Sequence, residues 1–425
     1  MDNASASQPS SDRLALLYHL AQTFNSTLDL DQVLNRVIDE VIVATHAERG
    51  FVMLREPDGR LSFQAARGID QQTIDDPAFQ VSRSVVEKVA LEGKPIVTYD
   101  AQTDSRFNMR QSVVILGLRS VLCAPLAIKN TILGVIYVDN RLQAGIFTHS
   151  DLELLSAIAS NAAIAIDNAR LYKLAVEKGR LERELQMARQ VQASLIPKEI
   201  PQAEGWEFAA RWLPARQVAG DFYDILVLPD HQPRLVIADV SDKGMPAAMF
   251  MGLTRTILRA SLDQASSPME GIQRANRLIC ADSADGMFVT LFYAQLQLEK
   301  GDFTYVNAGH NPPLLYRCGN PKSQPEIQLL TKTGMALGIL PDNAYEQQTV
   351  HLEHGDCLFL YTDGVTDAQN PHGEHFGLER LKTLVHDSCG EPVGKIMQRL
   401  EQELSDFTGG QEPVDDITML AIRRV

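Results

Sequence analysis

The chain has 425 residues and a formal net charge of −15, with 45% apolar and 22% charged residues. This length exceeds what one ordinary hydrophobic core spans, so two or three globular domains are expected. The negative charge argues against a nucleic-acid partner and against an anionic membrane surface, because both require a positive surface potential.

The first residues, Met1–Arg13, lack the basic region and the apolar stretch of a signal peptide. No apolar run reaches the roughly 18–20 residues that span a bilayer, so a cytoplasmic protein with no membrane partner is expected. The cysteines are widely spaced and form no CxxC pair, which favours reduced thiols over a disulfide framework or a zinc site. They are Cys123, Cys280, Cys318, Cys357 and Cys389.

The N-terminal third changes from a helical to a strand-like hydrophobic period. Helical spacing covers Leu14–Phe24 and Leu30–Val43, and a further helix is predicted at Ser150–Leu171. Between them lie short β-rich runs bounded by turn signals. These predicted strands are Gly50–Leu54, Leu61–Ala65, Pro95–Tyr99, Ser120–Ile128 and Thr131–Val138, the last two forming a hairpin. The pattern indicates a compact α+β domain.

Two segments carry a family resemblance, GLRSVLCAPLAIKNTILGVIYVDN and FTHSDLELLSAIASNAAIAIDNARLY. With them, residues 11–172 resemble a GAF domain, a sensor fold with an antiparallel sheet and helices. The resemblance implies either a site for a small-molecule ligand or a dimerisation and relay unit, and both remain open. A bilin is not expected, because Cys123 lies in the middle of a strand pattern.

A long helical pattern follows over residues 151–196 and overlaps the last helix of the first domain. Apolar and small residues from Leu155 to Tyr172 alternate spacings of three and four, as in a two-helix seam. A second stripe begins at Leu174, and the register change falls at Lys173–Gly179. We expect a coiled-coil connector that forms a parallel homodimer and passes a change between the domains. The alternative is an amphipathic helix folded back on one domain.

The C-terminal half alternates predicted strands and helices, which favours two sheets with helices outside them. The predicted strands are Phe208–Leu213, Asp221–Val227, Arg234–Val240, Met287–Leu298, Asp302–Asn307, Pro313–Tyr316, Gln347–Leu352, Asp356–Tyr361 and Ile417–Arg423. The predicted helices are Met245–Leu262, Pro268–Asp282, Leu378–Val385 and Val393–Phe407.

Acidic residues cluster at the edges of these strands. They are Asp221 and Asp224, Asp239 and Asp242, Asp363, and Asp415 and Asp416. Few basic residues adjoin them, so bringing them together would concentrate negative charge that a cation must offset. Oxygen ligands suit hard divalent ions, Mg²⁺ or Mn²⁺. Enzymes that hold two such ions about 3.5–4 Å apart lower the pKa of a bridging water for attack on phosphate. Phosphate-ester hydrolysis is therefore predicted.

Six ordered motifs strengthen this prediction: AGDFYD, IADVSDKGMPAAMFM, FVTLFYA, NAGHNPPLL, FLYTDGVTDAQN and DDITML, preceded by ERELQMARQVQASLIP. Over residues 180–425 the chain resembles the SpoIIE-type branch of the PPM (protein phosphatase 2C-like) serine/threonine phosphatases. The resemblance implies an α-β-β-α sandwich over 197–425 and two bound Mn²⁺ or Mg²⁺ ions. The implied metal ligands, which act through the ions and a bridging water, are Asp221, Asp239, Asp363, Asp415 and the Val240 carbonyl.

The resemblance also implies supporting roles. Gly220 keeps the backbone close to the first ligand, and Asp416 supports the ligands rather than binding metal. Asp224 and Asp242 are either further ligands or turn formers and ligand supports. Where the eukaryotic phosphatase 2C pattern has Asp-Gly-His, this chain has Asp239-Val240-Ser241. Since serine is a poor acid, a metal-bound water or another group must protonate the leaving group. His310 is one candidate, with a turn-stabilising or substrate-adjacent role as the alternative.

Two other functions are alternatives to a PPM-type phosphatase. A haloacid dehalogenase reading of YTDGV would place its nucleophile at Tyr361, which cannot form an acyl phosphate. A non-enzymatic sensor and scaffold that only binds a phosphoprotein is the second rival, and the intact aspartates weigh against it. The favoured function is a GAF-regulated phosphoserine/phosphothreonine phosphatase. By resemblance, its substrate is a small STAS-type anti-sigma-factor antagonist.

Overall fold

The computed structural model describes residues 9–68, 70, 72–74, 81–99, 119–227, 232–283, 286–318 and 326–425. The chain divides into two compact units, Met1–Leu181 and Glu182–Val425. One helix, α5 (His149–Leu195), belongs to both and continues through Gly179 without a break. None of the helices in the described ranges combines the length and the apolar character needed to cross a bilayer.

The N-terminal unit contains one antiparallel sheet with the strand order β2-β1-β5-β4-β3. Its strands are β1 (Arg49–Arg55), β2 (Leu61–Gly68), β3 (Ile96–Thr98), β4 (Ser120–Ile128) and β5 (Thr131–Asn140). Its helices are α1 (Pro9–Phe24), α2 (Leu30–Thr45), α3 (Arg83–Glu92) and the first part of α5. The predicted hairpin is confirmed, because β4 and β5 pair from Ser120 and Asn140 to Ile128 and Thr131.

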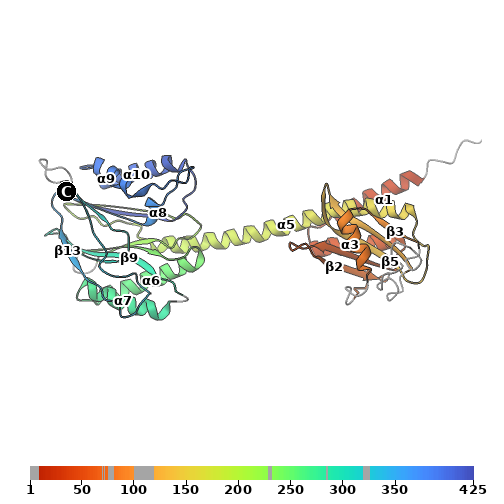
Figure 1. Ribbon diagram of the computed structural model, residues 1–425, viewed down its shortest axis with the longest axis horizontal. Helices are drawn as coiled ribbons and strands as arrows, with labels where there is room; N and C mark the ends of the chain where they lie inside the picture. Colours follow the sequence, from red (N-terminus) through yellow and green to blue (C-terminus); the bar gives the residue numbers. More distant parts are fainter. Residues whose placement is uncertain are drawn as a thin grey trace, which may run out of the picture. The chain divides into compact units, whose positions relative to one another are not determined.

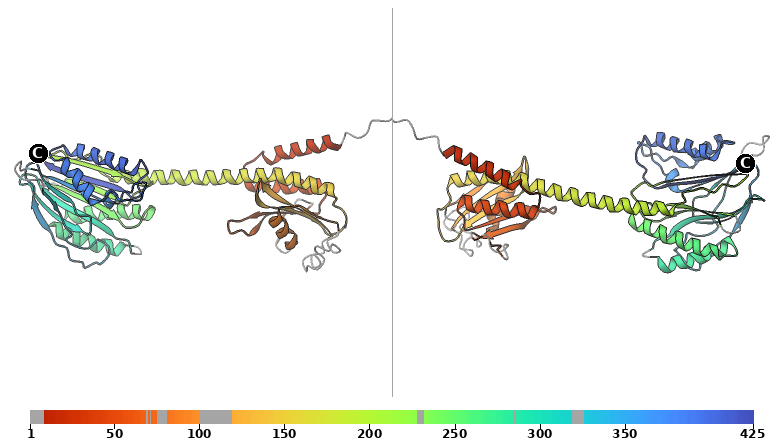
Figure 2. Two further views of the ribbon diagram at one scale, coloured as in Figure 1. Left: turned by 45° about the horizontal axis from the view of Figure 1, so that its top comes forward. Right: turned by 180° about the vertical axis from the view of Figure 1, so that it is seen from behind.

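Both faces of this sheet are covered (Figures 1 and 2). Alternate residues of a strand point to opposite faces. Val52 and Leu54 of β1 therefore join the core with α1, α2 and α5, whereas Phe51 and Met53 pack on the side of α3. Helix α3 was not predicted. The helix has ten residues and ends at Gly93, which adopts a left-handed conformation.

The C-terminal unit contains two five-stranded sheets. The first has the order β13-β10-β9-β8-β7, and the second has the order β12-β11-β14-β15-β6. The strands of the first sheet are β7 (Phe222–Val227), β8 (Pro233–Val240), β9 (Val289–Gln297), β10 (Asp302–Ala308) and β13 (Gln348–His351). Those of the second are β6 (Trp206–Leu213), β11 (Leu314–Arg317), β12 (Glu326–Leu329), β14 (Cys357–Tyr361) and β15 (Ile417–Arg424).

Helices cover the two outer faces, so the predicted α-β-β-α sandwich is confirmed (Figure 1). Helices α6 (Met245–Asp263) and α7 (Pro268–Asp282) lie on the first sheet, and α9 (Gly377–Asp387) and α10 (Val393–Thr408) lie on the second. Leu420 and Ile422 of β15 face the core between the sheets, while Met419 and Ala421 face α9 and α10. Strand β12 and the four-residue helix α8 (Asp363–Thr366) were not predicted.

The expectation that all cysteines are reduced was wrong for one pair. Cys318 and Cys389 form a disulfide, with their Cα atoms 6.0 Å apart and a sequence separation of 71 residues. The fold brings the end of β11 close to the segment after α9, and a separation of this size carries no signal in the sequence. Cys123 and Cys357 are buried free thiols, and Cys280 is free and partly buried.

Candidate metal centre

The two sheets deliver the predicted ligands to one end of the sandwich. Asp221 immediately precedes β7, and Asp239 is the penultimate residue of the neighbouring strand β8. In the facing sheet, Asp363 begins α8 after β14, and Asp415 lies just before the adjacent strand β15. Strand β15 contacts both β7 and β8, which brings the two pairs of aspartates together.

Asp221 and Asp239 lie in a shared acidic environment. Burial, and then the charge of Asp239, raise the pKa of Asp221 well above its usual value, while a hydrogen bond from Thr362 opposes the rise. Burial, and then the charge of Asp363, raise the pKa of Asp239 from 3.8 to about 7. Asp221 is only 2% exposed, and its Oδ2 atom is buried without a hydrogen-bond partner. A buried acceptor of this kind fits a cation.

The other two aspartates also interact. Burial, and then the charge of Asp415, raise the pKa of Asp363, while the charge of Lys243 lowers it. The ammonium of Lys243 lies 2.8 Å from Asp415 Oδ2. As placed in the described residues, no three His, Cys, Asp or Glu side chains converge closely enough to hold a metal ion. To bind one ion together, the proposed ligand side chains would have to turn toward it.

Asp416 and Gly220 hold the loop before β7 in place. Asp416 Oδ1 accepts the N–H of Ala215 and Oδ2 accepts the N–H of Gly220, both at 2.8 Å. With both oxygens engaged, Asp416 holds the loop before Asp221 in place. A Cβ atom on Gly220 would lie 3.1 Å from the Val240 carbonyl oxygen. Glycine therefore lets the loop of Asp221 approach the carbonyl that the resemblance makes a ligand.

Asp224 forms an ion-pair cluster with two arginines of α6. Its carboxylate accepts two hydrogen bonds from Arg259, at 2.7 and 2.8 Å, and lies 3.1 Å from Arg255. Asp242 is a turn former with φ 75°, and its Oδ1 accepts the N–H of Lys243 at 2.8 Å. Of the two alternatives for these residues, the contacts favour the structural one.

His310 and Ser241 are both engaged in structural contacts. His310 is 1% exposed, its Nδ1 lies 2.9 Å from Thr290 Oγ1, and burial lowers its pKa to about 3. The imidazole is therefore neutral near pH 7 and is a poor source of a proton. Ser241 Oγ accepts the N–H of Phe288 at 2.9 Å, which ties the loop after β8 to the start of β9.

The donor set fits hard divalent cations, because it consists of carboxylate and carbonyl oxygens around an unpartnered buried acceptor. Asp221, Asp239, Asp363, Asp415 and the Val240 carbonyl are the groups that would hold them. Such ions, when bound, supply Lewis acidity toward phosphate oxygens and a water with a lowered pKa. Asp416 and Gly220 then fix the position of the Asp221 loop.

Three contacts at this centre were not anticipated from the sequence. Lys243 is the one basic residue in IADVSDKGMPAAMFM, and its contact with Asp415 was not predicted. Thr362 directly precedes Asp363, and its hydrogen bond to Asp221 was not predicted. Gln192, near the end of α5, clamps the backbone of Ala219: its Nε2 donates to the carbonyl at 2.5 Å and its Oε1 accepts the N–H at 3.0 Å.

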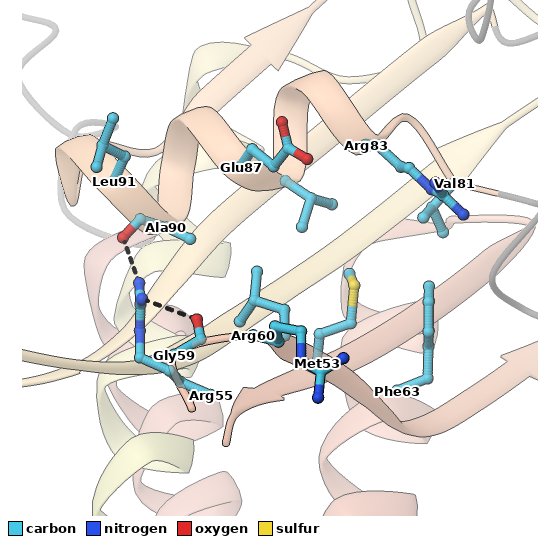
Figure 3. A pocket seen from close by; sticks show the side chains of 12 residues that line it. Met53, Arg55, Gly59, Arg60, Phe63, Val81, Arg83, Glu87, Ala90 and Leu91 are labelled. Carbon is cyan, nitrogen blue, oxygen red and sulfur yellow. Dashed lines mark hydrogen bonds between the residues drawn. The ribbon is translucent and has the colours of Figure 1, made fainter. Parts of the chain in front are cut away.

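A second candidate site is a cavity of about 650 Å³ in the N-terminal unit, between α3 and the β1–β2 hairpin (Figure 3). Its lining combines apolar side chains, among them Met53 and Phe63, with Arg60 of the hairpin and with Arg83 and Glu87 of α3. Arg55 donates to the carbonyls of Gly59 and Ala90, at 3.3 and 3.0 Å, and so joins the hairpin turn to the end of α3.

The pKa of Asp239 predicts how the stability of the chelated protein depends on pH. The folded-state pKa, about 7, lies above the ordinary value of 3.8, so the folded state binds the extra proton between these values. Protonation of Asp239 therefore contributes to the stability of the folded state, and this stabilisation is complete below about pH 4 and is lost as the pH rises toward 7. We expect the free energy of unfolding of wild type, relative to Asp239→Asn, to fall across this window. Urea titrations in EDTA from pH 4.5 to 7.5 measure it, and a constant difference would contradict the prediction.

Comparison with known proteins gives matches to both units. The family model described as stage II sporulation protein E (SpoIIE) matches residues 229–425, and that of the GAF domain matches residues 27–167. Protein IcfG of Synechocystis sp. is 34% identical over 269 residues, which are 57% of this chain and 41% of IcfG. Phosphoserine phosphatase RsbU of Bacillus subtilis is 33% identical over 250 residues, 57% of this chain and 71% of RsbU. The chain thus spans less than half the length of IcfG.

A solved structure supports the fold of the C-terminal unit. The SiaA-PP2C domain of Pseudomonas aeruginosa matches with a TM-score of 0.52 and 22% identity. The match covers 59% of this chain and 99% of that domain. At this level of identity the likeness concerns the fold alone.

Proposed function

The chain belongs to the SpoIIE-type PPM serine/threonine phosphatases and carries a GAF domain, and on this premise we propose that it is a metal-dependent protein phosphatase. The reaction would be hydrolysis of phosphoserine or phosphothreonine with two Mn²⁺ or Mg²⁺ ions. The observation that carries the proposal is the meeting of Asp221 and Asp239 with Asp363 and Asp415 at one end of the sandwich. We take the GAF domain as residues 11–172, the connector as 151–196 and the phosphatase domain as 197–425.

The proposed substrate is a small phosphorylated STAS-type protein, an anti-sigma-factor antagonist. Support comes from the family membership and from the relative RsbU, whose name is phosphoserine phosphatase. The alternative function, a scaffold that binds a phosphoprotein without hydrolysing it, would need a centre that no longer binds metal.

The test is phosphate release by the purified full-length protein from a phosphorylated STAS protein, from an unrelated phosphoserine protein and from a generic phosphate ester. Each reaction is run with Mn²⁺, with Mg²⁺ and with EDTA. We expect metal-dependent release from all three substrates, fastest from the STAS protein. Stable binding of the phosphoprotein without release under any condition would favour the scaffold.

We also propose that the protein forms a homodimer through α5 and that this helix carries regulation. Several apolar side chains in its middle stretch are exposed among the residues that the structure describes, including Leu174, Leu181 and Val191 at 53%, 58% and 65%. Gln192 fixes the end of α5 to Ala219, two residues before Asp221. A rotation of α5 would therefore reach the metal centre directly.

The phase of α5 should control activity. Each residue turns a helix by about 100°, so two residues inserted after Gly179 shift the downstream phase by about 200°, whereas seven residues shift it by only about 20°. We expect phosphate release by the two-residue variant to change severalfold and that of the seven-residue variant to stay near wild type. Steady-state assays of the full-length variants measure this. If the two variants behave alike, the connector does not transmit a change in phase.

For the N-terminal domain we propose that a small molecule binds in the cavity beside α3 and sets the state of α5. The apolar lining residues, such as Met53 and Phe63, together with the guanidinium of Arg83, suit a ligand with an apolar body and an acidic group. A pure dimerisation and relay role is the alternative.

A further inference from the structure

Lys243 forms an ion pair across the candidate metal centre. It lies in the turn between β8 and α6, and its Nζ atom is 2.8 Å from Asp415 Oδ2 and 3.3 Å from the carbonyl oxygen of Val414. The two charged side chains are 43% and 38% exposed. The contact therefore joins the loop after Asp239 to the segment before β15, at the edge of the centre that faces solvent.

Both carboxylate oxygens of Asp415 are engaged by donors of the chain itself. Oδ2 meets the ammonium of Lys243, and Oδ1 accepts the N–H of Asp416 at 2.9 Å. Among the described residues, this is the one ion pair made by the four proposed carboxylate ligands. A divalent cation that uses Asp415 must therefore compete with the ammonium for the carboxylate.

The turn holds Lys243 at this place. Asp242 before it has φ 75° and Gly244 after it has φ 80°, and both values lie in the region that favours glycine. Asp242 Oδ1 also accepts the backbone N–H of Lys243 at 2.8 Å. The position of the ammonium thus follows from a defined backbone, while its long, half-exposed side chain remains able to swing into solvent.

The ammonium of Lys243 lies among several negatively charged carboxylates. Asp221, Asp239, Asp363 and Asp415 gather at one end of the sandwich, and their mutual repulsion opposes folding when no metal is bound. A positive group of the chain reduces that repulsion. It also repels an incoming metal ion, since like charges at this range interact unfavourably.

We propose that Lys243 is a positioning residue that acts as the internal counter-ion of the metal centre. In the metal-free protein its ammonium holds the carboxylate of Asp415, and a divalent cation that binds there displaces the ammonium. This rests on the proposed function, because it concerns the same metal centre. Lys243 then lowers the affinity for metal. Because Lys243 lies in the Ser241–Gly244 turn, the fraction of protein with metal bound also depends on the conformation of this turn.

Titration calorimetry of Mn²⁺ into the full-length protein tests this without any measurement of activity. Lys243→Met keeps the length of the side chain and removes its charge, and we expect it to bind Mn²⁺ about fivefold more tightly than wild type. Lys243→Arg keeps the charge and should bind within about twofold of wild type. Lys395→Met, at an exposed position of α10, is the matched control and should leave affinity unchanged.

Thermal unfolding in EDTA supplies the second readout. We expect Lys243→Met to unfold at a lower temperature than wild type without metal and to gain more from Mn²⁺, whereas a variant damaged in its fold would bind metal more weakly. Equal or weaker Mn²⁺ binding by Lys243→Met, with wild type binding normally, overturns this inference and leaves the proposed function intact. If wild type and variant both fail to bind Mn²⁺ or Mg²⁺, both proposals fall.

Discussion

Replacing Asp239 by alanine should reduce phosphate release by at least about 1000-fold, equivalent to about 4 kcal/mol of lost transition-state stabilisation. Asp239 lies among the other three proposed ligands, and its pKa of about 7 reflects burial and the charge of Asp363. Without its carboxylate the centre loses a ligand, and Mn²⁺ affinity should fall in calorimetry along with activity.

The same substitution should not destabilise the metal-free protein. Removing one of several mutually repelling carboxylates relieves unfavourable interactions, so the midpoint of unfolding in EDTA should stay constant or rise. Loss of activity with unchanged or increased stability separates a ligand from a structural residue. Asp406→Ala, at an exposed site on α10, is the control and should leave activity and metal binding unchanged. If Asp239→Ala kept wild-type activity, Asp239 would not be a metal ligand.

Replacing Asp224 by alanine should have the opposite result, a loss of about 3 kcal/mol of unfolding free energy with metal affinity kept within about twofold. Asp224 is 2% exposed at its side chain and pairs with Arg259 and with Arg255, whose side chain is 12% exposed. Without the carboxylate, Arg255 keeps its buried charge and loses its partner. Chemical denaturation measures the stability, and calorimetry with Mn²⁺ measures the affinity.

A surface ion pair provides the control for Asp224. Glu379 pairs with Lys382 on α9 and is 85% exposed, so Glu379→Ala should change stability by less than about 0.5 kcal/mol. If Asp224→Ala instead left stability intact and weakened Mn²⁺ binding more than tenfold, Asp224 would be a metal ligand. That outcome would revise its assignment to the ion-pair cluster.

Local patterns in the sequence predicted most of the fold and the principal carboxylates. Strands such as β4, β5 and β15 show their character in a few adjacent residues, because alternation and turn signals act over short distances. Asp221 and Asp363 are proposed as ligands on the same kind of evidence, from motifs at the ends of strands. Helix α3 and strand β12 were not predicted.

Contacts between distant segments were not predictable in this way. Arg259 lies 35 residues from Asp224, and nothing in either segment indicates the pairing. The disulfide between Cys318 and Cys389 and the contact of Lys243 with Asp415 likewise depend on how the sheets and helices pack together. The two hydrogen bonds between the Gln192 side chain and the backbone of Ala219 were also not predicted, because the sequence of α5 indicates only a connector helix.

The place of β15 in its sheet has a consequence for the order of folding. This strand lies between β14 and β6, and its register joins Ile417 to Leu213 and Arg424 to Trp206. Asp416 reaches Ala215 and Gly220 across 201 and 196 residues of chain. Pairings of such long sequence separation form slowly, so we expect this end of the sandwich to be completed after the local hairpins and helices. A divalent cation held by the proposed ligands would then bind only the folded domain, and by mass action it would stabilise that domain against unfolding.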